Sequence, residues 1–100
     1  MGNSPGLLRQ YQDYFYKYES LQGGFIWEWA NHGLYVNKGG KDVYCYGGDF
    51  GEYPHDGVFI MDGLVDSQHN PTPGLIEYAK VIEPIVIEIT GNKIKVTNTF

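Results

Sequence analysis

The chain has 100 residues, of which 42% are hydrophobic, a size that permits one small domain and excludes two full ones. Seven basic residues against twelve acidic ones give a formal net charge of -5, so there is no basic stripe for a phosphate backbone and we expect no nucleic-acid partner. No apolar run approaches the roughly 20 residues needed to span a bilayer, and no secretory signal is readable at the N-terminus, so we expect no membrane partner and a cytoplasmic location.

The first predicted element is an amphipathic helix from about Pro5 to Tyr18. Ser4 followed by Pro5 fits an N-cap with proline at the first helical position. Apolar residues then recur at spacings of three or four, which places them on one face of a helix. They are Leu8, Tyr11, Phe15 and Tyr18.

The middle of the chain is predicted to be rich in loops, with short strands. Phe25 to Trp27 is the best candidate, because three consecutive apolar residues suit a strand buried on both faces of a parallel sheet. Val43 to Tyr46 and Val58 to Met61 are weaker candidates. The stretch from Asn37 to Asp42 is predicted to be a loop or turn.

A second helix and a hairpin are predicted to follow. Thr72-Pro73 repeats the helix start signal, and the apolar face that follows ends at Pro84. The hydrophobic period then changes to two from Ile85 onward. Gly91-Asn92 fits a tight turn between two strands.

Two segments that combine glycine pairs with aromatic residues indicate a carbohydrate site. They are Leu21 to Trp29 and Tyr46 to Phe50, and the pattern continues through Phe59 to Leu64. A glycine pair lets the backbone pass close to a ligand, and tryptophan faces stack on the apolar C–H surface of a sugar. Trp27 and Trp29 would share one side of a strand, where core packing is an equal alternative to ligand stacking.

The acidic residues allow both a catalytic and a structural interpretation. Glu28 is flanked by two tryptophans and could act as a general acid, but we favour a carboxylate that is hydrogen-bonded to backbone or paired with a cation. Asp49, Asp56 and Asp62 could supply hard oxygen ligands to a metal. Their spacing is not that of a calcium loop, so a metal there would need ligands from outside this segment.

The histidines and the cysteine give weaker signals. His32, His55 and His69 share no zinc-binding spacing, and we expect at least two of them to be ordinary surface or hydrogen-bonded residues. The single cysteine, Cys45, allows no intrachain disulfide and fits a reducing compartment.

Several segments, taken in order, resemble the β-galactosidases of glycoside hydrolase family 2. They are Met1 to Ser4, Leu21 to Trp29, Tyr46 to Gly51, Asp56 to Val65 and Pro71 to Tyr78. The stretch from Trp27 to Gly33 is most similar to the yeast lactases. The resemblance extends over the whole chain, and the combination of motifs is specific.

The resemblance implies an α/β fold, namely the C-terminal part of a (β/α)8 TIM barrel over residues 1–84 and the first hairpin of a β-sandwich domain over residues 85–100. The first helix would follow the seventh barrel strand, Phe25 to Trp29 would be the eighth strand, and Pro73 to Glu83 would close the barrel. Such a barrel needs about 250 residues, so this chain alone is not expected to close one.

The resemblance also implies roles for four residues. Trp27 matches a tryptophan that lines the galactose pocket. Phe59 matches a phenylalanine whose main-chain oxygen binds Na⁺, and Asp62 stands where bacterial enzymes have an asparagine that contacts both Na⁺ and the sugar. His55 stands where those enzymes have an asparagine near Mg²⁺, a role that histidine suits poorly, so we expect most Mg²⁺ ligands to lie outside this chain.

The implied reaction is retaining hydrolysis of a β-galactoside such as lactose, which needs two carboxyl groups about 5 to 5.5 Å apart. Both glutamates precede this segment in the family, and Glu28 matches neither, so we expect no catalytic residue here. The expected partners are the sugar and the remainder of the catalytic domain, within a homo-oligomeric parent enzyme. Three alternatives remain: a galactoside-binding module, a docking or complementing module, and a fragment without a stable fold.

Overall fold

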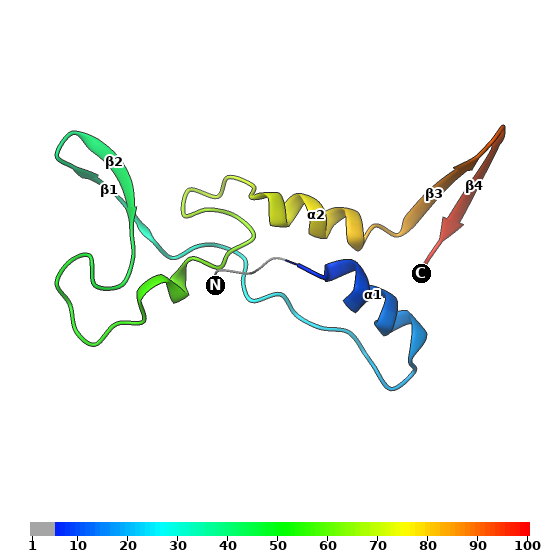
Figure 1. Cartoon of the computed structure of the whole chain (residues 1–100), viewed down its shortest axis with the longest axis horizontal. Coiled ribbons are helices and arrows are strands. Elements are labelled where there is room, and N and C mark those ends of the chain that lie inside the picture. Colours follow the sequence, from blue (N-terminus) through cyan, green and yellow to red (C-terminus); the bar gives the residue numbers. More distant parts are fainter. Residues whose placement is uncertain (1–5) are drawn as a thin grey trace.

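In the computed structural model, residues 6–100 are described, and they form two helices, two hairpins and a short 3-10 helix. Figure 1 shows the helices side by side in the middle of the molecule, with one hairpin at either end. The elements in order are α1 (Leu8–Lys17), β1 (Leu34–Lys38), β2 (Lys41–Cys45), η1 (Gly57–Ile60), α2 (Pro73–Val81), β3 (Ile85–Thr90) and β4 (Lys93–Asn98). Neither helix is long and apolar enough to cross a membrane.

The molecule is elongated. Its radius of gyration is 18.7 Å and its principal extents are 58 × 34 × 19 Å, whereas a compact domain of this length would have a radius of gyration of about 13 Å. The buried hydrophobic side chains among residues 6–100 are Cys45, Leu64, Val65 and Val81. The apolar surface that would form a larger core is therefore exposed, as expected for part of a barrel and not for a closed one.

Helix α1 confirms the first predicted helix, but it begins later than predicted. Its N-cap is Leu7, in the left-handed conformation at φ 60°, with no capping hydrogen bond from a side chain. Within the described residues the helix therefore begins at Leu8, because the left-handed backbone at Leu7 is not helical. The predicted Ser4-Pro5 cap lies outside the described residues.

Helix α2 confirms the second predicted helix, which ends at Val81. The Thr72 side chain does not cap it, since both the hydroxyl and the backbone N–H of Thr72 donate to the carbonyl of Leu64, at 2.8 and 3.1 Å. These two bonds hold the start of α2 against Leu64.

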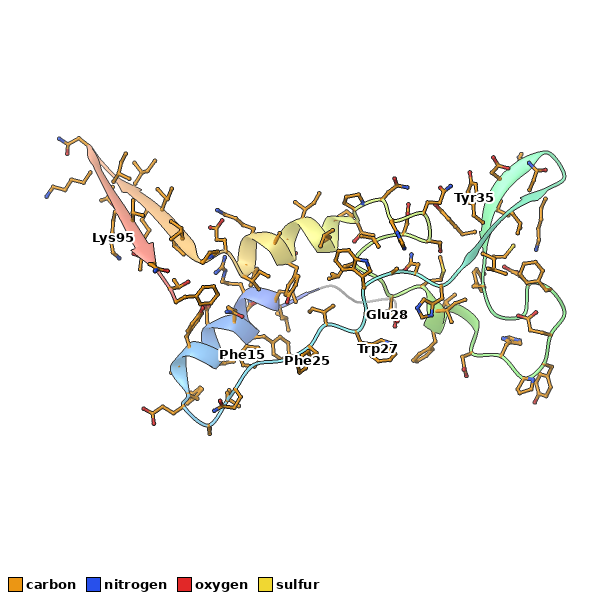
Figure 2. The ribbon with its side chains drawn as sticks, turned by 180° about the vertical axis from the view of Figure 1, so that it is seen from behind. Phe15, Phe25, Trp27, Glu28, Tyr35 and Lys95 are labelled. Carbon is orange, nitrogen blue, oxygen red and sulfur yellow. The ribbon has the colours of Figure 1, made fainter. Side chains whose placement is uncertain are left out.

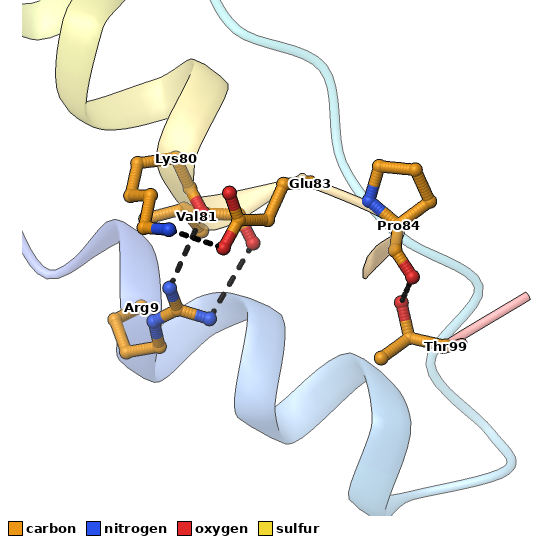
Figure 3. Close-up of polar contacts among 6 residues, drawn as sticks. All are labelled: Arg9, Lys80, Val81, Glu83, Pro84 and Thr99. Atoms are coloured by element: carbon orange, nitrogen blue, oxygen red, sulfur yellow. Dashed lines mark hydrogen bonds and ion pairs between the residues drawn. The ribbon is translucent and has the colours of Figure 1, made fainter. Parts of the chain in front are cut away.

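The two helices are joined by one side chain at the C-terminal end of α2. The Arg9 guanidinium donates to the carbonyls of Lys80 and Val81, each at 3.4 Å (Figure 3). The terminal carbonyls of a helix have no intrahelical partners and carry partial negative charge, so a cation is favourable there.

Strands β3 and β4 confirm the predicted hairpin. They are antiparallel, with Ile87 opposite Val96 and Ile89 opposite Ile94, so these aliphatic side chains share one face with Ile85. All five are exposed. The assignment of the hairpin to a β-sandwich domain stays a prediction.

The strand predictions for the middle of the chain had mixed outcomes. Val43 to Tyr46 overlaps β2, which pairs with β1 across a turn at Gly39 and Gly40, where φ is 60° and 83°. Strand β1 was not predicted. Val58 to Met61 is not a strand, because most of it belongs to the 3-10 helix η1.

Phe25 to Trp27 was wrongly predicted to be a strand. The segment has no strand assignment, and the Phe25 side chain is fully exposed, at 103%. A strand of a parallel sheet requires neighbouring strands for its backbone hydrogen bonds, and the described part of the chain supplies none beside these residues.

Candidate functional site

The candidate site lies where residues 28–31 run parallel to residues 62–65. Glu28 donates its N–H to the carbonyl of Asp62 at 3.3 Å and accepts from the N–H of Leu64 at 2.9 Å. Val65 donates to Trp29 at 2.9 Å and accepts from Asn31 at 3.0 Å. These four bonds hold together two segments that are far apart in the sequence.

Gly63 allows the close approach of these segments. A Cβ atom at this position would overlap the backbone of Ala30 and Asn31 and would lie 2.6 Å from the carbonyl oxygen of Val65. The N–H of Gly63 donates to the side-chain oxygen of Asn31 at 2.7 Å. Glycine is required here because there is no space for a side chain.

A pocket of about 400 Å³ opens beside these paired segments, and both Trp27 and Asp62 line it. These are the two residues predicted to bind substrate. Figure 2 shows Trp27 on the extended segment next to Glu28. The remaining lining residues come from the same two segments and from the starts of both helices. They are Gly6, Leu8, Ile26, Asn31, Met61, Gly63, Leu64, Thr72, Pro73 and Gly74.

Asp62 has one carboxylate oxygen without a partner in the described part of the chain. Its Oδ1 atom is buried and has no hydrogen-bond partner among residues 6–100. Burying a polar atom without a partner costs free energy, so a hydrogen-bond donor or a cation beside this oxygen would be favourable. A hydrogen-bond donor or a hard cation would satisfy this oxygen, since hard cations take oxygen ligands.

Phe59 and His55 do not line this pocket. Phe59 lies on η1, with its side chain 60% exposed. His55 is part of a local loop structure: its Nδ1 accepts from the N–H of Gly57 at 3.2 Å, and its ring lies against Gly48.

The described residues contain no group of three or more His, Cys, Asp or Glu side chains that could hold a metal ion. Asp49, Asp56 and Asp62 are therefore not gathered into one site. Asp49 instead accepts from the N–H of Tyr46 at 2.9 Å and stabilises a turn. The chemistry around His55 does not fit Mg²⁺, which prefers carboxylate and water oxygens.

The structure gives Glu28 a polar neighbour, as the structural interpretation expects, and its role in catalysis stays a prediction. Its side chain is 18% exposed, and Oε2 lies 3.0 Å from Nε2 of His32. The prediction that Trp27 and Trp29 share one side of a strand is wrong, because no strand forms there and only Trp27 lines the pocket.

Asn31 is a site residue that sequence reasoning missed. It lines the pocket and holds Gly63 in place through its side-chain oxygen. It follows the two tryptophans at the end of a glycine- and aromatic-rich stretch, and this position next to a predicted site was the only sequence signal for it.

The loop after Val65 is stabilised by Asp66 and leads to the start of α2. The side chain and then the backbone N–H of Asn70 lower the pKa of Asp66, and the N–H of Gln68 and the Tyr44 hydroxyl add to this effect. Burial and the nearby Asp66 carboxylate raise the pKa of Tyr44. This network connects the β1–β2 hairpin to the loop that positions Thr72 and Pro73 beside the pocket.

Comparison with known proteins identifies the relatives of this chain. Residues 1–87 match the family described as Glycosyl hydrolases family 2, TIM barrel domain. A protein named beta-galactosidase from Kluyveromyces lactis is 59% identical over 98% of this chain, and one from Arthrobacter sp. is 48% identical over 92% of it. A beta-galactosidase from Actinobacillus pleuropneumoniae is 43% identical over 98% of the chain. The chain spans about a tenth of the length of these relatives, 10%, 9% and 10% respectively.

Proposed function

This chain belongs to family 2 of the glycosyl hydrolases, in their TIM barrel domain, and on that premise we propose that it forms part of the sugar pocket of a retaining β-galactosidase. The substrates would be terminal β-D-galactosides such as lactose. The observation that carries the proposal is that Trp27 and Asp62 line one pocket of about 400 Å³.

In this proposal the chain binds and orients the sugar. Trp27, which is 75% exposed, offers an aromatic face to the apolar side of galactose. Asp62 accepts hydrogen bonds from sugar hydroxyl groups. The resemblance to the family places both catalytic glutamates before this segment, and Glu28 matches neither of them, so in this proposal the nucleophile and the acid/base come from another part of the enzyme.

A sodium ion would be held by the unpartnered carboxylate oxygen of Asp62 and the main-chain oxygen of Phe59. The buried, unpaired Oδ1 of Asp62 supports this assignment. When bound, the ion would supply a fixed positive charge that attracts a hydroxyl oxygen of the sugar. No role is proposed for Mg²⁺ at His55.

The test is a chimera in which this chain replaces the matching segment of the Kluyveromyces lactis relative. We expect the chimera to hydrolyse an aryl β-galactoside with retention of configuration, and to keep kcat/KM within about tenfold of the unaltered relative, a difference of about 1.4 kcal/mol. A chimera that has the oligomeric size and thermal stability of the relative but does not hydrolyse the substrate would contradict the proposal.

The sodium assignment has its own test in the same chimera. Asp62→Ala should raise the Na⁺ concentration needed for half-maximal activity by about tenfold or more, since a carboxylate ligand is lost. The matched control is Asp56→Asn, which alters an exposed carboxylate outside the pocket and should leave the Na⁺ dependence unchanged. An unchanged Na⁺ dependence in Asp62→Ala would contradict the assignment of a sodium site to Asp62.

A docking or complementing module is the second candidate function, and the elongated shape of the chain favours it. The radius of gyration of 18.7 Å and the exposed aliphatic faces indicate surface that another polypeptide would cover. Activity that appears only when this chain is mixed with a relative lacking the matching segment would support this candidate.

A further inference from the structure

The two polar ends of the Asn31 side chain have different environments. The oxygen accepts from the N–H of Gly63 at 2.7 Å, in a partly buried contact. The Nδ2 atom has no hydrogen-bond acceptor among residues 6–100. Asn31 is half-buried and lines the pocket of about 400 Å³. It therefore brings to the candidate sugar pocket a side chain with an unused hydrogen-bond donor.

The bond to Gly63 determines which end of the amide is free. An amide oxygen accepts hydrogen bonds and an amide nitrogen donates them, so only the oxygen can face the N–H of Gly63. That N–H belongs to the peptide group that follows Asp62, and the carbonyl of the same peptide group accepts from the N–H of Glu28 at 3.3 Å. Asn31 is therefore anchored beside the residue proposed to bind the sugar, and its nitrogen is left for another partner.

The pocket supplies few other polar side-chain groups. Among its described lining residues, hydrogen-bonding side chains belong to Trp27, Asn31, Asp62 and Thr72. The Thr72 hydroxyl already donates to the carbonyl of Leu64 at 2.8 Å. The indole N–H of Trp27 lies in the plane of its ring, so it points away from a sugar stacked on the ring face. Nδ2 of Asn31 is the donor that remains.

The acceptor that matches this donor is the Asp62 carboxylate. Its Oδ1 atom is buried and has no partner among residues 6–100. An ionised carboxylate only accepts, whereas a hydroxyl group both donates and accepts. One sugar hydroxyl can therefore donate to a carboxylate and accept from an amide at the same time. We propose that Asn31 is a specificity-determining residue that donates from Nδ2 to the same galactose hydroxyl group that donates to Asp62.

The consequence of this pairing is selection for a hydroxyl group at one position of the sugar. A site built to hydrogen-bond a hydroxyl rejects an analogue that lacks it, because the polar groups of the site are then left without partners. A carboxylate alone would leave the oxygen of that hydroxyl unpaired, so the amide of Asn31 sharpens the selection. The inference rests on the proposed function, because it adds a residue to the proposed sugar pocket.

Sugar binding to the chimera described above tests this inference. The probes are a methyl thio-β-galactoside, which resists hydrolysis, and the analogues in which each of its hydroxyl groups is replaced in turn by hydrogen. Dissociation constants are measured by calorimetry at a saturating Na⁺ concentration. We expect one analogue to bind at least about tenfold more weakly than the parent thiogalactoside, since it leaves both Asn31 and Asp62 without a partner. Equal binding of all the analogues would overturn the inference.

Asn31→Asp separates the donor role from the contact with Gly63. The carboxylate has nearly the shape of the amide and keeps an oxygen for the N–H of Gly63, but when ionised it cannot donate. We expect the variant to bind the thiogalactoside about tenfold more weakly. Removal of the selected hydroxyl should then weaken binding by only about threefold or less, because its donor is already gone. A loss as large as in the unaltered chimera would contradict the proposal.

Asn92→Asp is the matched control, because it makes the same change of charge in the exposed turn between β3 and β4, outside the pocket. It should leave every dissociation constant unchanged, and an effect equal to that of Asn31→Asp would assign the change to charge and reject the inference. Asn31→Ala introduces no charge and should show the same reduced loss. It takes the place of Asn31→Asp if that variant does not keep the oligomeric size of the chimera.

The outcomes separate this inference from the proposed function. A chimera that hydrolyses the aryl β-galactoside, but selects the same hydroxyl equally strongly with and without the Asn31 amide, retains the proposed function and rejects the inference. A chimera that shows the expected selection but does not hydrolyse the substrate does the reverse. A chimera that neither binds the thiogalactoside nor hydrolyses the substrate counts against both.

Discussion

The Glu28 carboxylate lies 3.0 Å from the imidazole of His32, four residues later in a segment that is not helical. The pair spans the point where the extended segment joins residues 62–65. This contact favours a structural role for Glu28 over a role in bond cleavage, which stays a prediction.

Glu28→Gln in the chimera should therefore retain activity within about tenfold, because the amide has nearly the same shape as the carboxylate and keeps an oxygen that can face His32. Removal of a catalytic carboxylate would instead lower kcat by about 10⁴-fold or more. Steady-state hydrolysis of an aryl β-galactoside distinguishes the two cases, and a loss of that size would restore the general-acid interpretation.

Trp27→Ala should reduce kcat/KM of the chimera by about 10- to 100-fold, the expected effect of losing an aromatic platform against the sugar. Trp29→Ala is the matched control: it removes the same side chain two residues away, outside the pocket. The measurements are kcat/KM and the inhibition constant of galactose for each variant. Equal effects of the two substitutions on both would show that Trp27 has no special role in sugar binding.

Gly63→Ala should disrupt the backbone pairing between residues 28–31 and 62–65. The added methyl group would overlap backbone atoms of Ala30 and Asn31, which cannot move independently of the chain. We expect a destabilisation of about 3 kcal/mol. The control is Gly24→Ala, whose methyl group would meet only the Phe15 ring, at 3.3 Å. Thermal inactivation of the two chimeras checks this, and equal midpoints would contradict it.

Asp66 should make the loop of residues 66–70 sensitive to acid. Hydrogen bonds, first from the Asn70 side chain, hold the pKa of Asp66 below its ordinary value. The folded pKa is lower than the unfolded pKa of about 4, so the ionised carboxylate stabilises the loop fully at pH values above the unfolded pKa. This stabilisation is lost as the pH falls through the folded pKa. An NMR titration of the Gln68 and Asn70 amides should show this transition in the isolated chain.

The matched variants for that titration are Asp66→Asn, which should abolish the transition, and Asp13→Asn on α1, which should retain it. Amide shifts of Gln68 and Asn70 that titrate identically in Asp66→Asn and the parent chain would contradict the assignment.

The isolated chain should melt without a sharp cooperative transition. The described part buries few hydrophobic side chains, and the chain has a radius of gyration of 18.7 Å, so its hairpins and helices lack a common core. Calorimetry is the measurement: we expect a broad, weak heat-absorption profile, and a van't Hoff enthalpy equal to the calorimetric one would refute the expectation.

The elements that could be predicted from sequence are those with local signals. Thr72-Pro73 marks the start of α2, and Gly91-Asn92 marks the turn between β3 and β4. These signals act within a few residues, so they hold in a short chain as well as in a complete enzyme.

The predictions that failed concern segments whose structure depends on distant residues. Phe25 to Trp27 has the composition of a buried parallel strand, but no neighbouring strand is described for it. The meeting of Trp27 and Asp62 in one pocket was expected only from the family resemblance, since no spacing rule relates residues 35 positions apart. Asn31 contributes through a contact with Gly63 that sequence pattern cannot show.

The contact between Thr99 and Pro84 has a consequence for assembly. The N–H of Thr99 donates to the Pro84 carbonyl at 2.9 Å. The Thr99 hydroxyl donates to the same carbonyl at 3.1 Å (Figure 3). The two strands β3 and β4 are thus held together by hydrogen bonds at their open end and by the turn at the other end. A slip of one residue would send their isoleucines to the opposite face, and these contacts oppose such a slip. The β3–β4 ribbon therefore presents its aliphatic side chains on one face in a fixed register, and these contacts lower the cost of ordering its backbone when a partner docks.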